Sequence, residues 1–305
     1  MLRSKLTILG CHSSIPTKDF YPTAQILELR RHFFLIDCGE GTQVQIRRAQ
    51  IKFNRIVHIF ISHLHGDHFF GLMGLLSTFQ LLGWKNPLNI YAPKGLKEII
   101  DTHLKWSSGK LTYPIKHIEL SSEKSEKIFE DEKAQVYTIP LKHRIYTNGF
   151  LFKEKPRERK LDIDTIKKHP EIEICDYQNL KLGKDFITKN GQTTSNNQLT
   201  LDPPKILSYA FCSDTAYHRA IIDQIRGVDL LYHESTFLSG EEDWAKTTGH
   251  ATAAQAASIA QEAGVGKLLL GHYSSRISNI KIFEHEARKI FPNTEASEVL
   301  KTYLL

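Results

Sequence analysis

The sequence feature that most constrains this chain is the stretch "FISHLHGDHFFG", residues 60–71, in which three histidines and a carboxylate fall within six positions. The segment "IVHIFISH", which leads into it, is β-branched and mostly apolar, so it predicts a buried strand. The polar motif then lies on the loop that leaves this strand. Because layered α/β folds place their sites on such loops, the stretch predicts both a buried sheet and a site at its edge.

The residue types in this loop are those of a metal site, because neutral imidazole and carboxylate oxygens are common zinc ligands. Alternate side chains of an extended segment point to one side, so His63 and His65 are expected to reach one metal ion together. Gly66 allows a sharp turn, after which Asp67 and His68 would face a neighbouring position. This suits two metal ions about 3.5–4 Å apart. The alternative is a polar loop with incidental histidines, and four candidate ligands at this spacing favour the metal site.

A two-metal site needs more ligands than one loop supplies, and other predicted strand ends offer them. "IPLKHR" brings His143, "FCSDTA" brings Asp214 and "LLGHYSSR" brings His272. Each residue follows an apolar run, and the two oxygens of Asp214 could bridge two metal ions. Taken singly, each could equally be an ordinary polar group at the end of a strand. Together with the first motif they form a consistent set.

Predicted strands and helices alternate along the chain. Strands are expected in "KLTILG", on both sides of the turn in "AQILELRRHFFLIDCGEGT", and in "LNIYAP", "KAQVYTIPLKH", "ILSYAFCSD", "VDLLYHES" and "KLLLGHYSS". Helices are expected in "FFGLMGLLSTFQLLG", "KGLKEIIDTHLKW" and "TAAQAASIAQEAG". Residues 153–197 are polar, charged and poor in apolar runs. This pattern favours a layered α/β fold around one core, with an inserted excursion.

Composition narrows the class of protein further. The chain has 305 residues, of which 41% are hydrophobic, enough to bury a sizeable core. Its four cysteines form no Cys-x-x-Cys pair, so we expect reduced thiols. There is no run of 18 apolar residues and no signal-like N-terminus, so we expect a cytoplasmic protein without a membrane span. A net charge of +6 suggests an anionic partner, although many basic proteins bind none.

Beyond the metal motif, the chain closely resembles ribonuclease Z, the family of metallo-β-lactamase-fold endonucleases that mature tRNA 3′ ends. The resemblance runs from near residue 6 to near residue 276. The matching stretches are "LTILGCHSSIPT", "LIDCGEGTQVQ", "FISHLHGDHFFGLMGLL", "IPLKHRI", "CSDTA", "LLYHEST", "GHATAAQAA" and "GVGKLLLGHYSSR". The His-x-His-x-Asp-His core alone gives only the superfamily, whereas this ordered combination is specific to the family.

The resemblance implies an α/β fold, the αβ/βα four-layer sandwich, in which two sheets lie face to face with helices outside. Residues 1–305 would form a single domain with an inserted flexible arm, and the protein would be a homodimer with two zinc ions per subunit. The metal ligands implied are His63, His65 and His143 for one zinc ion, Asp67, His68 and His272 for the other, and Asp214 as the bridge.

The resemblance also implies catalytic roles in zinc-dependent removal of 3′ trailers from precursor tRNA, leaving a 3′-hydroxyl on the tRNA and a 5′-phosphate on the trailer. Asp67 would orient or deprotonate the attacking water. His250 would deliver a proton or stabilise an oxyanion, and Glu234 would orient His250. The alternative for His250 is a residue that merely precedes a helix, with Thr252 as a candidate cap. Both interpretations can hold together.

The polar insertion at 153–200 takes the place of the family's arm, an exosite that grips the tRNA elbow. Lysine and arginine bind phosphates without base specificity, which suits a substrate defined by its shape. The alternative is a solvated insertion, because acidic residues are interspersed. The stretch "YQNLKLGKDF" keeps the Leu-Lys-x-Gly of the family arm but lacks the Gly-Pro that often precedes it. The partners implied are precursor tRNA and a second subunit, with no membrane and no DNA.

Two other functions stay open at this point. A hydrolase of the same fold could act on a small substrate, as a cyclic-nucleotide phosphodiesterase, lactonase or arylsulfatase, but such an enzyme needs no long charged arm. A catalytically silent RNA-binding protein could also use the fold. The intact set of candidate ligands speaks against that second possibility.

Overall fold

The computed structural model describes residues 4–107 and 110–305, and they divide into two compact units. The main unit consists of the described residues within 1–153 together with Leu207–Leu305. The second unit is Glu154–Ile206. The insertion therefore has its own compact structure, and it extends past the C-terminal boundary of the predicted segment 153–200.

Two large sheets form the centre of the main unit. The first contains β1 (Lys5–Gly10), β2 (Ala24–Leu29), β3 (His32–Ile36), β4 (Ile56–Phe60), β5 (Leu88–Pro93), β6 (Ile115–Leu120) and β18 (Thr302–Leu304). The second contains β7 (Lys127–Glu130), β8 (Ala134–Pro140), β9 (Asn148–Glu154), β14 (Ser208–Cys212), β15 (Leu230–Glu234), β16 (Lys267–Gly271) and β17 (Thr294–Ala296). The strand orders within the described residues are β18-β1-β2-β3-β4-β5-β6 and β17-β16-β15-β14-β9-β8-β7.

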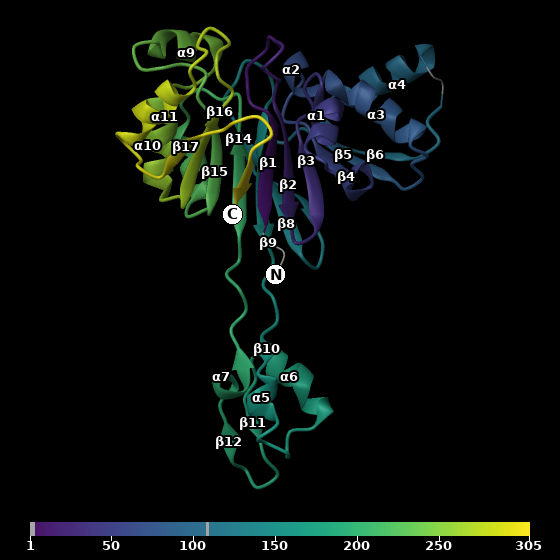
Figure 1. Cartoon of the computed structure of the whole chain (residues 1–305), viewed down its shortest axis with the longest axis vertical. Coiled ribbons are helices and arrows are strands. Elements are labelled where there is room, and N and C mark those ends of the chain that lie inside the picture. Colours follow the sequence, from purple (N-terminus) through teal and green to yellow (C-terminus); the bar gives the residue numbers. More distant parts are fainter. Residues whose placement is uncertain (1–3, 108–109) are drawn as a thin grey trace. The chain divides into compact units, whose positions relative to one another are not determined.

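Helices cover the outer faces of the two sheets (Figure 1). On the first sheet these are α1 (Thr42–Arg48), α2 (Gly66–Phe69), α3 (Gly71–Leu81) and α4 (Leu96–Trp106). On the second they are α8 (Ile222–Ile225), α10 (Ala253–Ala263) and α11 (Lys281–Arg288), while α9 (Glu242–Thr248) lies on the connection between β15 and α10. The order of layers is helix, sheet, sheet, helix, which confirms the predicted αβ/βα sandwich.

The strands are apolar because both of their faces are buried. In β4, Phe60 faces the core between the sheets, where it packs with Phe34 and Phe152. Ile59 belongs to the other cluster, under α3, together with Phe79. Alternate side chains thus enter two different cores, which explains the nearly continuous apolar run before the histidine motif.

Helix α10 begins and ends as its sequence predicts. The Thr252 hydroxyl accepts from the Gln255 amide at 3.2 Å, and the Gln255 side chain accepts from the Thr252 amide at 3.0 Å. This reciprocal pair caps the first turn. Gly264, with a φ of 60°, ends the helix in the left-handed conformation. The predicted cap at Thr252 is therefore present, and it fixes the chain two residues after His250.

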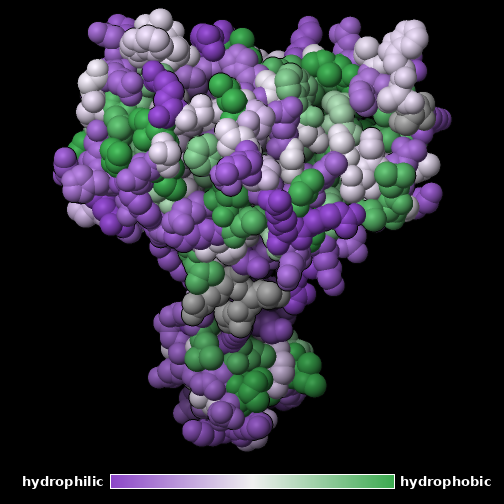
Figure 2. Space-filling model, turned by 45° about the horizontal axis from the view of Figure 1, so that its top comes forward, coloured by the Kyte–Doolittle hydropathy of each residue, from purple (hydrophilic) through white to green (hydrophobic). Residues whose placement is uncertain are grey.

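The second unit is built from short elements. They are β10 (Lys160–Leu161), β11 (Phe186–Ile187), β12 (Thr193–Thr194), β13 (Thr200–Leu201), α5 (Ile163–Ile166), α6 (Tyr177–Lys181) and α7 (Asn196–Leu199). Its core consists of Ile166, Ile172, Leu180, Phe186 and Leu199. These apolar residues are separated in the sequence by polar ones, so the sequence contains no apolar run that would predict this core. Polar and charged residues dominate the surface in Figure 2, with apolar residues scattered among them.

The described residues contain no helix with the length and apolar character needed to cross a bilayer.

Candidate metal centre

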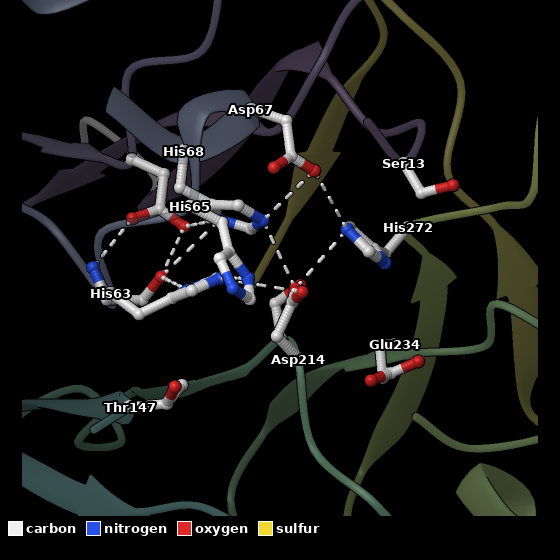
Figure 3. Close-up of polar contacts among 12 residues, drawn as sticks. Ser13, His63, His65, Asp67, His68, Thr147, Asp214, Glu234 and His272 are labelled. Carbon is white, nitrogen blue, oxygen red and sulfur yellow. Dashed lines mark hydrogen bonds and ion pairs between the residues drawn. The ribbon is translucent and has the colours of Figure 1, made fainter. Parts of the chain in front are cut away.

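The seven predicted ligands converge at one edge of the two sheets, on loops that leave strands. The first motif follows β4, and the loops after β8, β14 and β16 bring His143, Asp214 and His272 to it. Figure 3 shows the imidazole rings of the first motif and of His272 directed towards the Asp214 carboxylate. The convergence follows from the fold, because the ends of neighbouring strands meet at one sheet edge.

Within the described part of the chain, the side chains form three overlapping groups with the dimensions of metal sites. Within each group the potential ligand atoms lie within 4.8 Å of one another. The groups are His63, His65, His143 and Asp214, then Asp67, His68 and His272, and lastly Asp214, His250 and His272. The first two groups correspond to the ligand sets that the family resemblance implies, and the assignment of these residues to two metal ions stays a prediction.

The two oxygens of Asp214 face different groups. Oδ2 lies 3.6 Å from Nε2 of His63 and 3.8 Å from Nε2 of His143. Oδ1 lies 3.2 Å from Nε2 of His68 and 3.3 Å from Nε2 of His272. A carboxylate placed in this way has one oxygen available to each of two metal ions, as a bridging ligand requires.

Ring nitrogens left without partners support a fit to metal ions. Among the described residues, the Nε2 atoms of His68 and His272 are buried and have no hydrogen-bond partner. An unpaired buried polar atom costs free energy, so such atoms call for a ligand. Histidine nitrogens and aspartate oxygens are a donor set that zinc accepts. These residues therefore fit the metal ions that the fold family implies.

Asp37 and Ser62 orient the histidines of the first motif from behind. The Nδ1 of His68 lies 2.7 Å from Oδ2 of Asp37 and donates to it. Ser62 donates its hydroxyl proton to Asp37 at 2.9 Å, so its oxygen is left to accept from Nδ1 of His63 at 3.0 Å. Both rings therefore carry their proton on Nδ1 and direct the lone pair of Nε2 towards the centre.

The two histidines from later strand ends are oriented in the same manner. Nδ1 of His143 donates to the Gly249 carbonyl at 2.8 Å. The Thr236 hydroxyl donates to Glu234 at 2.7 Å, so its oxygen accepts from Nδ1 of His272 at 2.9 Å. Again the Nε2 atoms are left for the centre. Such partners fix the tautomer and the ring orientation of metal-binding histidines.

Asp37 was not singled out in the sequence, although a signal was available. It follows strand β3 directly, just as the candidate ligands follow their strands. It is fully buried, and its φ of 56° places a non-glycine residue in the left-handed region. Asp214 and His272 share this conformation, with φ values of 61° and 56°. Such backbone persists only where the surroundings hold it, and it clusters at functional sites.

Burial favours the neutral form of the central imidazole. His63 is fully buried, and this desolvation lowers its pKa well below the ordinary value. A neutral imidazole is the form that binds metal ions, so the ring needs no deprotonation at neutral pH.

His250 and Glu234 form a separate pair beside the cluster. Nδ1 of His250 lies 2.8 Å from Oε1 of Glu234, which is fully buried. Burial alone lowers the pKa of His250, but the Glu234 carboxylate outweighs this and raises that pKa to about 9. Glu234 also accepts from the amides of Thr215 and Ala251. The carboxylate thus holds a protonated imidazole in place.

A cavity of about 460 Å³ opens over the cluster. Its lining includes His65, Asp67, Asp214, His250 and His272. The remaining lining residues are Ser13, Ser14, Arg144, Thr236, Phe237, Trp244, Thr248, Ser274 and Arg276. The centre is therefore accessible to a ligand, and two arginines and two large aromatic residues surround the entrance.

A family model matches only the part of the chain that precedes most of the inserted unit. Residues 4–157 match the family model described as Anti-Pycsar protein Apyc1. This half contains the first motif and His143, but it ends before Asp214, His250 and His272. Full-length relatives cover these residues as well. The chain is 46% identical to the ribonuclease Z of Bacteroides fragilis (strain YCH46) over 296 residues, which are 96% of each protein. It is 45% identical to the ribonuclease Z of Bacteroides thetaiotaomicron over 294 residues, covering 96% of this chain and 93% of the relative.

Solved structures agree with these relatives. The crystal structure of human tRNase Z, short form, is 27% identical, has a TM-score of 0.70 and covers 98% of both chains. The metallo-β-lactamase fold protein YhfI from Bacillus subtilis has a TM-score of 0.69 over 99% of both chains at 17% identity, so it supports the fold alone. With near-complete coverage and identities of 45% and 46% to these two relatives, the chain belongs to the ribonuclease Z family of metallo-β-lactamase-fold hydrolases.

Proposed function

We propose that this protein is a zinc-dependent endoribonuclease that removes 3′ trailers from precursor tRNA, with a 3′-hydroxyl on the tRNA and a 5′-phosphate on the trailer as products. The observation that carries the proposal is the division of the Asp214 oxygens between two donor groups, in a chain related to ribonuclease Z along its whole length. Two metal ions held side by side suit the hydrolysis of a phosphodiester.

The two ions would be zinc, held by the seven residues described above. When bound, zinc makes water a nucleophile near neutral pH and neutralises charge on phosphoryl oxygens. The buried ring nitrogens of His68 and His272 and the shared carboxylate of Asp214 support this assignment.

Asp67 would hold the attacking water. Its Oδ2 lies 3.6 Å from Nε2 of His68 and 3.5 Å from Nε2 of His272, and it accepts from the Ser14 amide at 3.0 Å. These contacts all use Oδ2, and Oδ1 lies outside them. That second oxygen would accept a proton from water and orient the water towards phosphorus.

His250 would protonate the departing 3′ oxygen. Its Nδ1 is bonded to Glu234, so the proton on Nε2 is the one available to a substrate in the cavity. With its pKa raised to about 9, the imidazole is protonated at neutral pH and can act as a general acid. Glu234 acts through His250 and is a positioning residue.

The unit Glu154–Ile206 would be the arm that binds tRNA. The protein would work as a cytoplasmic homodimer, with precursor tRNA and not DNA as its substrate. The insertion of this unit between two strands of the second sheet supports its role as an appended binding element, because the sheet does not need it.

The test is to incubate the zinc-loaded protein with a 3′-extended precursor tRNA and to map the cut. Cleavage at the 3′ end of the tRNA body, with the stated end groups, is expected. Bis(p-nitrophenyl) phosphate and lactones serve as competing small substrates. Turnover of these with no cleavage of precursor tRNA would overturn the proposal in favour of a small-molecule hydrolase.

Substitution of Asp67 by alanine tests the role of that carboxylate. Asp67→Ala should abolish cleavage, because both a ligand and the base for water are lost, while binding of precursor tRNA stays largely intact. Single-turnover cleavage and a filter-binding titration measure the two effects. Near-normal turnover by metal-loaded Asp67→Ala would contradict the assignment.

A further inference from the structure

Trp244 is an exposed aromatic residue at the entrance of the metal centre. It lies in α9, its exposed fraction is 63%, and it lines the same cavity as His250 and the candidate ligands. Single exposed apolar residues are common on protein surfaces, so the observation that matters is the position of Trp244 in the lining of the cavity that contains the candidate ligands. None of the proposed catalytic steps uses this residue.

Arg276 is held next to Trp244 in a defined position. Its guanidinium carbon lies 5.6 Å from the centre of the Trp244 ring and 5.5 Å from that of Phe237. Its Nε donates to the Ser274 hydroxyl at 3.2 Å, and Nη2 donates to Glu241 at 3.4 Å. The cation is thus fixed between two aromatic rings, at distances typical of cation–π contacts.

Phe237, Arg276 and Trp244 form a row of neighbouring side chains that begins beside His250, the proposed proton donor. The ring centres of Phe237 and His250 are 6.2 Å apart, so Phe237 connects His250 to Arg276, and Arg276 connects to Trp244. Attack and departure occur on opposite sides of the phosphorus in an in-line displacement. Because His250 would serve the departing oxygen, the nucleotide that carries this oxygen leaves the centre along the same row.

We infer that Trp244 is a stacking platform for the nucleobase of the nucleotide whose 3′ oxygen departs, and that Arg276 contacts the backbone of the same strand. The inference rests on the proposed function, since it requires a nucleic-acid substrate. An indole stacks on any base, because every base has a π-face, and a neighbouring arginine adds charge attraction. The subsite is therefore a contact to an unpaired base, independent of base identity and separate from the arm.

A mutant cycle tests the inference. Trp244→Ala should lower kcat/KM for a 3′-extended precursor tRNA about tenfold, the scale of one lost base-stacking contact. An abasic residue at the last nucleotide of the tRNA body should cause a similar loss with the unaltered protein and no further loss with Trp244→Ala. An abasic residue at the first trailer nucleotide should leave the tenfold effect of Trp244→Ala in place.

Equal losses for Trp244→Ala on the normal substrate and on the substrate abasic at the last tRNA nucleotide would overturn the inference. So would a changed oligomeric state of the variant in light scattering, which would make Trp244 a subunit contact. Trp244→Phe retains a stacking ring and should stay within about threefold of the unaltered protein. Trp106→Ala is the matched control, because Trp106 is 79% exposed at the end of α4 and does not line the cavity.

Fluorescence separates a failure of this inference from a failure of the proposed function. In a Trp106→Phe background, which keeps Trp84 and Trp244, a short single-stranded RNA should quench the tryptophan emission, and this quenching should be absent when Trp244 is replaced by alanine as well. Quenching without any cleavage of precursor tRNA would refute the proposed function and leave the stacking contact standing. Cleavage with unchanged kinetics in Trp244→Ala would refute the stacking contact alone.

Discussion

At the scale of single residues, the site depends on partners behind the candidate ligands as much as on the ligands themselves. Asp37 shows this most clearly, because its carboxylate accepts from Nδ1 of His68 and from both the amide and the hydroxyl of Ser62. It is fully buried, and burial raises its pKa while His68 and Ser62 lower it, with a raised pKa as the net result. Burial disfavours a charged carboxylate at this position, and the hydrogen bonds from His68 and Ser62 are the interactions that stabilise it.

Substitution of Asp37 by asparagine should weaken zinc binding about 10–100-fold, the usual cost of removing a partner of a metal-binding histidine. The reason is that His68 loses the charged acceptor that fixes its ring and raises its basicity. Competition with a chromophoric chelator measures the affinity. Asp19→Asn, an exposed aspartate in the loop near the cavity, is the control and should keep full affinity. An Asp37→Asn affinity within twofold of the unaltered protein would remove Asp37 from the site.

At the scale of elements, the end of α9 sets the position of one candidate ligand. Gly249 ends this helix with a φ of 77°, and its carbonyl accepts from His143. A Cβ atom added at Gly249 would lie 2.8 Å from Nδ1 of His143. The absence of a side chain at Gly249 therefore permits two things. The helix can end in the left-handed conformation, and the His143 ring can pack closely against the backbone.

Gly249→Ala should therefore abolish most of the cleavage activity while the protein stays folded, since the new methyl group displaces His143. The loss of stability from a left-handed alanine is about 1–2 kcal/mol. Gly264→Ala is a matched control, because Gly264 also ends a helix in the left-handed region but has open space at its Cβ position. It should lose similar stability in urea unfolding and keep its activity. Equal activity of the two variants would contradict this account of His143.

At the scale of the whole molecule, the arm is an insertion that the sandwich can lose. Strands β9 and β14 are antiparallel neighbours, and Lys153 pairs with Ser208, so the chain enters and leaves the arm at adjacent positions. Residues 154–206 contain ten lysines and arginines against nine aspartates and glutamates. With almost no net charge, the arm would bind phosphates through the placement of its basic residues.

Replacement of residues 154–207 by a two-residue Asn-Gly turn should leave a folded sandwich, since such a turn would join Lys153 to Ser208, its partner in the antiparallel strand. The shortened protein should hydrolyse bis(p-nitrophenyl) phosphate at the normal rate and bind precursor tRNA at least tenfold more weakly, as several phosphate contacts are lost. Phosphodiester kinetics and a binding titration at fixed salt measure the two properties. Unchanged affinity for precursor tRNA would count against an RNA-binding arm.

Much of the main unit could be predicted from local patterns. The apolar run of β4, the turn at Arg30 and Arg31, and the cap at Thr252 are each contained in a few consecutive residues. Local chemistry decides such features, so the sequence reveals them. The small core of the arm could not be predicted, because its apolar residues meet only after the chain has folded back on itself.

By itself, the sequence determined the alternation of strands and helices and the set of seven candidate ligands, because buried strands and ligand-rich loops have compositions that can be read locally. The two-sheet sandwich and the family followed from the resemblance of its ordered motifs to ribonuclease Z. Only the tertiary structure decided which oxygen of Asp214 faces which group, that Asp37 and Thr236 hold the imidazoles, and that Trp244 stands at the entrance beside Arg276. The physical reason is that these contacts join side chains distant in the chain, whose directions depend on how the strand ends meet.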